Sequence, residues 1–191
     1  MKKFFAIAVA AACFAGAQLS AQEPRKAPEL AINVPGQGTK LLSQYRGKVV
    51  ALFFIFTTCP HCQAKTREME KVQNEFGSRG LQTIDVAVND NADLLVDNFV
   101  KDFQVNFPVG WVLRDQMLSF MGWNNPYFVV PQQVMIDRKG MIRYQTPPRE
   151  DATWDNLMKP EVIRQHIEEL LGSGGSASAR AESTHVALAK K

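Results

Sequence analysis

The chain has 191 residues, of which 46% are hydrophobic and 21% are charged, a composition typical of globular proteins rather than disordered ones. Its net charge of +3 excludes the strongly basic surface that nucleic-acid binding requires. Three cysteines are too few for a disulfide scaffold, and no segment reaches the roughly 18–20 continuous apolar residues of a membrane span. We therefore expect one folded domain without a nucleic-acid partner.

The N-terminus has the layout of a secretory signal peptide. A short positive start at residues 1–3 precedes an apolar run from Phe4 to Ala17, and small residues follow up to Ala21. This run is short for an uncleaved membrane anchor. We expect residues 1–21 to be a signal peptide, cleaved after Ala17 or Ala21, and the mature protein to be periplasmic or otherwise exported.

Cys13 lies inside this apolar run. It could carry a lipid after cleavage, but the preceding residues 10–12 are all alanine and lack the large aliphatic side chain that such sites usually have. A lipoprotein is therefore the less favoured alternative. If Cys13 leaves with the signal, Cys59 and Cys62 remain, in an oxidising compartment where their redox state matters.

Composition divides the remaining chain into three parts. Residues 22–40 are rich in proline, glycine and polar side chains, which predicts an extended lead-in. Residues 41–171 hold the apolar patterns of a folded domain. Residues 172–191, dominated by small and polar side chains, are expected to form a disordered tail.

Hydrophobic periodicity alternates between strand and helix patterns along the domain. The continuous apolar run over 48–56 predicts a strand buried on both faces, and the spacing over 60–76, ended by Gly77, predicts a helix. The later expected elements are a strand over 84–88, a helix over 95–103, a strand over 107–112, a helix over 114–121, a hairpin over 134–144 and a helix over 160–171. This order mixes crossover units with a terminal hairpin, so it predicts an α/β fold with a central mixed sheet and helices on both faces.

The motif Cys59-Pro60-His61-Cys62 follows the buried strand and opens the first helix. At a helix N-terminus, unpaired N–H groups and the helix dipole favour a thiolate, so the pKa of Cys59 should fall. Pro60 is tolerated in the first turn, and His61 can add a positive charge beside the sulfur. Cys62, one turn later, should be more buried and should attack the mixed disulfide that Cys59 forms. The motif predicts a redox-active pair, tuned by Pro60 and His61, without a metal or a separate cofactor.

Three other uses of such a pair are disfavoured. A zinc site lacks a second cysteine pair, and the remaining histidines, His166 and His185, fall on a helix and in the tail. Haem attachment needs C-x-x-C-H, whereas the histidine here lies between the cysteines. A purely structural disulfide between residues three apart would remove little chain entropy and so stabilise little.

These features resemble the thioredoxin superfamily, in particular the exported TlpA/ResA-type thiol–disulfide oxidoreductases. The stretch LLSQYRGKVVALFFIFTTCPHC, Leu41 to Cys62, is similar to that family's entry into the active site. In the family a cis-proline faces the C-x-x-C, and VVPQQVMIDRKG, starting at Val129, matches the strand that carries it. The resemblance implies a thioredoxin-like fold in which Pro131 is the cis-proline and the backbone at Val130 binds substrate.

Two positions depart from the family pattern. Many thioredoxin-like proteins have a carboxylate six residues before the first cysteine, where this chain has Phe53, so no buried acid is expected there to take the proton of Cys62. The family often has Trp just before the first cysteine, where this chain has Thr58. We expect Asp85 and Asp90 to cap or solvate local structure and assign them no role.

The sequence predicts an enzyme that exchanges thiols and disulfides with exported proteins, supported by a membrane redox partner. The C-P-H-C motif itself resembles the strongly oxidising DsbA-type enzymes, and a stabilised thiolate makes the disulfide a better oxidant. The direction of electron flow, whether oxidation, isomerisation or reduction, and the oligomeric state stay open.

Two other functions compete with this one. A peroxiredoxin-type peroxidase resembles P-x-x-x-T-x-x-C, but the proline and threonine positions hold Leu52 and Phe56 here. A copper-binding or metal-carrier module could use Cys59 and Cys62, because paired thiolates suit Cu(I), although no third soft ligand is evident nearby.

Overall fold

The computed structural model of the protein describes residues 23–172. The expected signal peptide and the expected tail beyond residue 172 lie outside the described residues.

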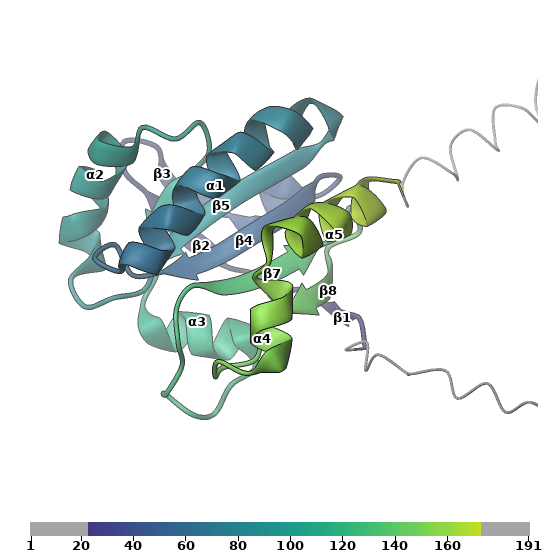
Figure 1. The fold of residues 1–191 in the computed structure, drawn as a ribbon. Helices are drawn as coiled ribbons and strands as arrows, with labels where there is room; N and C mark the ends of the chain where they lie inside the picture. The colour runs from purple at the N-terminus through teal and green to yellow at the C-terminus, as the bar shows by residue number, and fades with distance from the viewer. Residues whose placement is uncertain (1–22, 173–191) are drawn as a thin grey trace, which may run out of the picture.

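One mixed sheet forms the centre of the described region (Figure 1). Its eight strands run in the order β1-β8-β7-β4-β5-β6-β2-β3. β4, β5 and β6 are parallel, whereas β7 pairs antiparallel with β4 and β8 antiparallel with β7. The strands are β1 (Arg25–Lys26), β2 (Ala31–Val34), β3 (Gly38–Leu41), β4 (Val49–Ile55), β5 (Leu81–Ala87), β6 (Val109–Trp111), β7 (Gln132–Ile136) and β8 (Met141–Gln145).

Helices cover both faces of this sheet. The α-helices are α1 (Pro60–Phe76), α2 (Ala92–Phe103), α3 (Arg114–Met121), α4 (Ala152–Leu157) and α5 (Pro160–Gly172), and two short 3-10 turns are η1 (Leu42–Tyr45) and η2 (Gly77–Arg79). One core cluster joins α1, α2 and α5 to one face, and a second joins α3 to the other. The predicted α/β fold with a mixed sheet and helices on both faces is confirmed.

β4 is the central strand and explains why the sheet has two cores. All seven of its residues are buried. Its odd-numbered side chains, such as Phe53, belong to the cluster with α1, and its even-numbered ones, such as Phe54, belong to the cluster with α3. An uninterrupted apolar run is what a strand between two helix layers requires.

The expected lead-in differs from the structure. β1, β2 and β3 belong to the sheet, so the folded domain begins near Arg25 rather than at residue 41. β2 reaches the sheet through the pairing of Asn33 with Trp111 on β6, and Ile32 and Val34 are buried. The composition of this segment predicted an extended lead-in, but Pro28 and Pro35 lie outside its strands and leave β2 intact.

Candidate active site

Cys59 lies at the junction between β4 and α1. It is the N-cap residue of α1, its carbonyl accepts from the Gln63 N–H at 3.0 Å, and Pro60 is the first helical residue. The Cys59 N–H itself donates to the Phe56 carbonyl at 3.1 Å. A short loop thus connects β4 to the helix, and the cysteine pair lies at the start of α1.

The two cysteines differ in burial as the sequence predicts. Cys59 is partly exposed and Cys62 is fully buried, and both are free thiols. Burial raises the pKa of Cys62 most strongly. Its hydrogen bond with Cys59 and the charges of Cys59 and Asp85 raise the pKa further, against a lowering hydrogen bond from the Phe56 backbone. Cys62 is therefore held as a neutral thiol beneath Cys59.

The loop before Cys59 is fixed by two side chains that the sequence analysis did not identify. Asn89, just after β5, accepts from the Thr57 N–H at 3.0 Å and from its hydroxyl at 3.4 Å. Gln63 on α1 donates to the Thr57 carbonyl at 2.9 Å. Thr57 itself is buried. Nothing in the local sequence links residues 57 and 89, because they meet only through the pairing of β4 with β5.

Val130 and Pro131 lie at the same end of the sheet as the cysteines. Pro131 precedes β7, whose Gln132 pairs with Phe54 near the end of β4. The Val130–Pro131 peptide bond is cis. Val130 also packs against the core cluster that Cys59 contacts. The structure therefore brings the C-P-H-C loop and the Val130–Pro131 segment to one edge of the fold.

The loop before Pro131 also contacts the loop before Cys59. The rings of Phe56 and Phe128 meet edge to face, with centroids 6.0 Å apart. The Arg114 guanidinium lies over both rings, at 5.7 and 5.9 Å from their centroids. Tyr127, one residue earlier in the loop, is 74% exposed and offers an aromatic surface beside this contact.

Asp85 corrects one expectation of the sequence analysis. It was expected to cap or solvate local structure, but it is 1% exposed and lies in the middle of β5. Its Oδ2 accepts from the Thr66 hydroxyl at 2.6 Å. Burial raises the pKa of Asp85 to about 7, against the lowering effect of that hydrogen bond. The signal in the sequence was one acidic residue inside a predicted strand, between Ile84 and Val86. Asp90, by contrast, is exposed, and its carboxylate lies 3.4 Å from Arg114.

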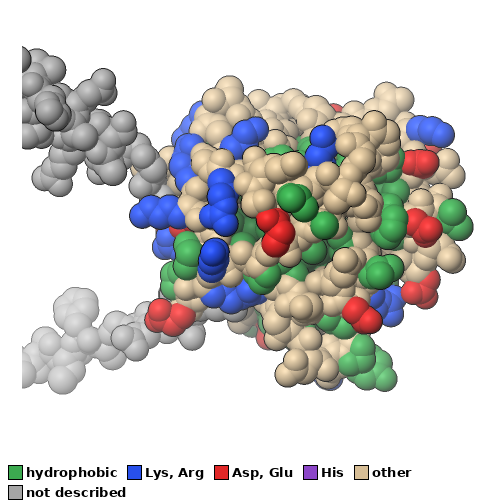
Figure 2. Space-filling view, turned by 180° about the vertical axis from the view of Figure 1, so that it is seen from behind, with side chains coloured by type: hydrophobic (Ala, Val, Ile, Leu, Met, Phe, Trp, Pro, Cys, Tyr) green, Lys and Arg blue, Asp and Glu red, His purple; other side chains and the backbone are tan. Residues whose placement is uncertain are grey.

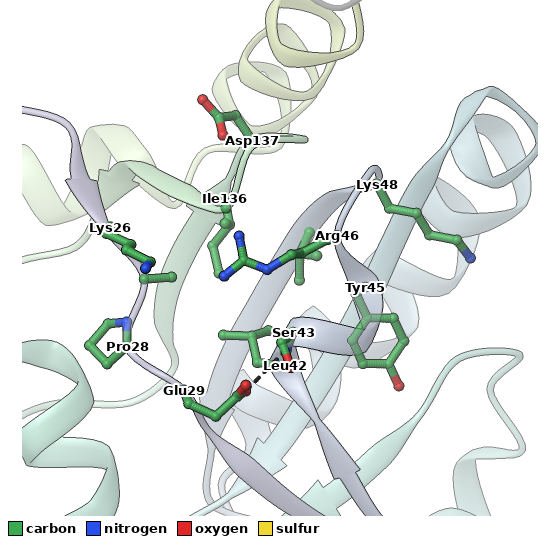
Figure 3. Close-up of a pocket in the computed structure, with 13 residues that line it drawn as sticks. Lys26, Pro28, Glu29, Leu42, Ser43, Tyr45, Arg46, Lys48, Ile136 and Asp137 are labelled. Atoms are coloured by element: carbon green, nitrogen blue, oxygen red, sulfur yellow. Dashed lines mark hydrogen bonds between the residues drawn. The ribbon is translucent and has the colours of Figure 1, made fainter.

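A hollow near the start of β4 is separate from the cysteines (Figure 3). It measures about 440 Å³ and includes Val50 at the beginning of β4 and Ile136 at the end of β7, so it lies at the opposite end of these strands. The Glu29 carboxylate within it accepts from the backbone N–H groups of Leu30 at 3.1 Å and Ser43 at 3.0 Å. It has no cysteine in its lining.

The surface adds little to the choice of site. Figure 2 shows Lys and Arg side chains gathered toward one side of the face opposite α1, with acidic and apolar side chains spread over the rest. Residues 23–172 contain no group of three or more His, Cys, Asp or Glu side chains placed to hold a metal ion. Among the same residues, no helix is long and apolar enough to cross a membrane.

A protein-family model for the AhpC/TSA family matches residues 24–145, which include every strand of the sheet. The chain belongs to the AhpC/TSA family. This membership agrees with the thioredoxin-like architecture and confirms the resemblance drawn from the cysteine motif.

Two of the similar proteins are named thiol-disulfide oxidoreductase ResA. The chain is 27% identical over 129 residues to the thiol-disulfide oxidoreductase ResA of Geobacillus thermodenitrificans, covering 68% of this chain and 67% of that protein. It is 34% identical over 98 residues to ResA of Bacillus subtilis, covering 51% of this chain and 54% of that protein. Together with the family, these relatives identify the chain as an oxidoreductase.

Solved structures share the fold. A thioredoxin-family thiol:disulfide interchange protein from Chlorobium tepidum superposes with a TM-score of 0.63 at 20% identity, covering 78% of this chain and 98% of that one. A thiol:disulfide interchange protein from Bacteroides superposes with a TM-score of 0.62 at 15% identity, covering 81% and 93%. At these identities the likeness concerns the fold alone.

Proposed function

We propose that the protein exchanges dithiols and disulfides with other proteins through the Cys59–Cys62 pair. The observation that carries this proposal is Cys59 at the N-cap of α1, with Cys62 buried in the first turn and hydrogen bonded to it. Cys59 is partly exposed at the start of α1 and can reach a substrate sulfur, whereas burial disfavours charge on Cys62. Cys59 is thus the nucleophile and Cys62 the resolving thiol.

The exchange then takes two steps. In the reducing direction, the Cys59 thiolate attacks one sulfur of a substrate disulfide, forming a mixed disulfide and releasing the other substrate sulfur as a thiolate. Cys62 loses its proton and attacks the Cys59 sulfur, so that the Cys59–Cys62 bond forms and the second substrate sulfur leaves. Two electrons pass from the dithiol to the substrate. The oxidising direction is the reverse, and the pair serves as its own redox group without a further cofactor.

We assign substrate binding to Val130 and Pro131. Their position at the edge that also carries the cysteines, with Val130 against the same core cluster as Cys59, supports this assignment. An extended substrate segment beside Cys59 would pair with the backbone at Val130. Pro60 and His61, both exposed between the cysteines, would tune the redox potential.

The signal-like N-terminus supports exported proteins as substrates. A membrane redox partner would return the cysteine pair to its starting state after each exchange. Relatives named thiol-disulfide oxidoreductase support the chemistry but not the direction of electron flow.

The deciding measurement is the reduction potential of the Cys59–Cys62 couple, by equilibration of the protein with glutathione buffers. A value toward roughly −120 mV would make it a donor of disulfides, and a value toward roughly −270 mV would make it a reductant of substrates. In parallel, Cys62→Ser should accumulate the mixed disulfide and Cys59→Ser should lose exchange. Full exchange by Cys59→Ser would overturn the proposed function. Stoichiometric Cu(I) binding without any exchange would favour a metal carrier instead.

A further inference from the structure

Asp85 is a buried acid that the exchange steps described above do not yet use. It lies on β5 beside Phe53 of β4 and Val109 of β6 in the strand pairing, so its neighbours within the sheet are apolar. Leu81 and Ala87, which alternate with it along β5, belong to the core cluster beneath α1. The carboxyl group therefore faces the helix that carries the cysteines.

Thr66 connects this carboxyl group to the active-site helix. Its hydroxyl donates to Asp85 Oδ2 at 2.6 Å. Thr66 lies four residues after Cys62 on α1, and both side chains are buried, so they occupy the same face of the helix one turn apart. Asp85 is thus hydrogen bonded to the residue that lies one helical turn after Cys62. Burial raises the pKa of Cys62 most strongly, and the charge of Asp85 raises it further.

The second oxygen of this carboxyl group is unused. Asp85 Oδ1 is buried and has no hydrogen-bond donor among residues 23–172. A buried acceptor without a donor costs stability, so such a group calls for a reason to be retained. A free oxygen near a thiol that must lose its proton provides that reason.

We propose that Asp85 accepts the proton of Cys62 when Cys62 attacks Cys59, and returns it when Cys62 is released. This proposal rests on the proposed function and identifies the group that exchanges a proton with Cys62. Position 53 has no acid, and Asp85 supplies one from the adjacent strand at the same level of the sheet.

In the reducing direction, the Cys62 S–H proton passes to Asp85 Oδ1, which becomes a neutral carboxylic acid. The Cys62 thiolate then attacks the Cys59 sulfur, the Cys59–Cys62 bond forms, and the bond from Cys59 to the substrate breaks. The substrate sulfur leaves with the electron pair of that bond. In the oxidising direction, Cys62 leaves as a thiolate and regains the proton from the acid.

Among the groups packed around Asp85, Cys62 is the ionisable one whose pKa depends on the charge of Asp85. From α1, Thr66 donates a hydrogen bond to it and Cys62 feels its charge, and the buried residues of α2 are Ala92, Val96 and Phe99, all apolar. The other buried charged residue of α1, Lys65, donates instead to Glu68 at 2.7 Å and to the Met158 carbonyl at 3.0 Å. Since a carboxyl with a pKa near neutrality can both take and give a proton at physiological pH, Asp85 is suited to this task.

The test separates the two chemical steps in the full-length protein. Formation of the mixed disulfide with a chromogenic aromatic disulfide, and its later resolution by Cys62, are followed by stopped flow between pH 5 and 9. Asp85→Asn should leave formation unchanged and slow resolution by about 10²-fold at pH 7.5. Asp90→Asn, which removes an exposed carboxylate, is the matched control and should change neither step.

A second variant guards against a purely structural effect. Thr66→Val keeps the carboxyl but removes the hydrogen bond that lowers the pKa of Asp85, so the pH midpoint of resolution should move upward while the maximal rate survives. If the pH profile of resolution in both variants equals that of the unmodified protein, the inference is wrong although the proposed function stands. If Cys59→Ser retains exchange, the proposed function itself has failed.

Discussion

Asp85 lies directly beside Phe53 in the parallel pairing of β4 with β5, and both side chains face α1. A charged residue beside a phenylalanine at the centre of a core is costly unless its charge is neutralised. This pairing should therefore affect the free energy of unfolding, independently of any effect on the rate of disulfide exchange.

The stability of the protein should depend on pH through Asp85. Its pKa is raised from the ordinary value of 3.8 to about 7, so the folded state holds a proton that the unfolded state has already lost between these values. The stability that the protonated group provides is therefore complete below pH 4 and is lost as the pH rises through 7. At pH 8 the free energy of unfolding of Asp85→Asn should exceed that of the unmodified protein by up to about 4 kcal/mol. At pH 4 the two free energies should be nearly equal.

Urea unfolding of the reduced proteins at pH 4, 6 and 8 checks this expectation. Asp90→Asn again serves as the control, because Asp90 is exposed. A difference between Asp85→Asn and the unmodified protein that stays constant over this pH range would contradict the assignment.

The loop before Cys59 should weaken when Asn89 is removed. Asn89→Ala leaves the buried Thr57 N–H without its acceptor, which is expected to cost about 1–3 kcal/mol of stability. Because Thr57 lies two residues before Cys59, the first exchange step should also slow. Asn106→Ala removes an exposed side-chain hydrogen bond to Asn74 and should change neither quantity beyond about 0.5 kcal/mol. Unfolding and exchange assays of both variants measure this, and equal behaviour would refute the role of Asn89.

The elements that follow from local pattern could be predicted from the sequence. β4 is an unbroken apolar run, and α1 has a proline at its first position, apolar side chains on one face and Gly77 after its last residue. Such features act over a few residues, so no knowledge of the rest of the chain is needed. The C-P-H-C motif lies where these two elements meet, with Pro60 to Cys62 in the first turn of α1, which is why its position could also be predicted.

The features that depend on distant partners could not be predicted in this way. Ile32 and Val34 alternate as a strand does, but β2 needs the Asn33–Trp111 pairing across 78 positions of chain to join the sheet. Asp85 looks like a surface residue until the pairing of β5 with β4 and the packing of α1 enclose it. A buried charge is defined by what surrounds it, and the surroundings come from other segments.

The short helix α4 should depend on its cap. Asp151 accepts from the Thr153 and Trp154 N–H groups, each at 2.8 Å. Asp151→Ala should lower the unfolding free energy by about 0.5–2 kcal/mol. Asp155→Ala, in the exposed first turn of the same helix, removes a charge without removing the cap and should cost less. Thermal unfolding compares the two, and an equal loss in both would show that charge rather than capping matters there.

Gly110 tests whether β2 is part of the folded domain. A methyl group at this position would lie 2.6 Å from the Asn33 carbonyl oxygen and 2.6 Å from Ile32, so Gly110→Ala must push β2 away from β6. Overpacking of this kind is expected to cost about 1–3 kcal/mol, and amide exchange should become faster in β2 and β3 while β4 and β5 keep their protection. Gly172→Ala is the control, because its methyl group would meet no atom of the described residues within 4 Å. If Gly110→Ala were as stable as that control, β2 would contribute little to the domain, and residues 22–40 would behave as the separate lead-in that their composition suggests.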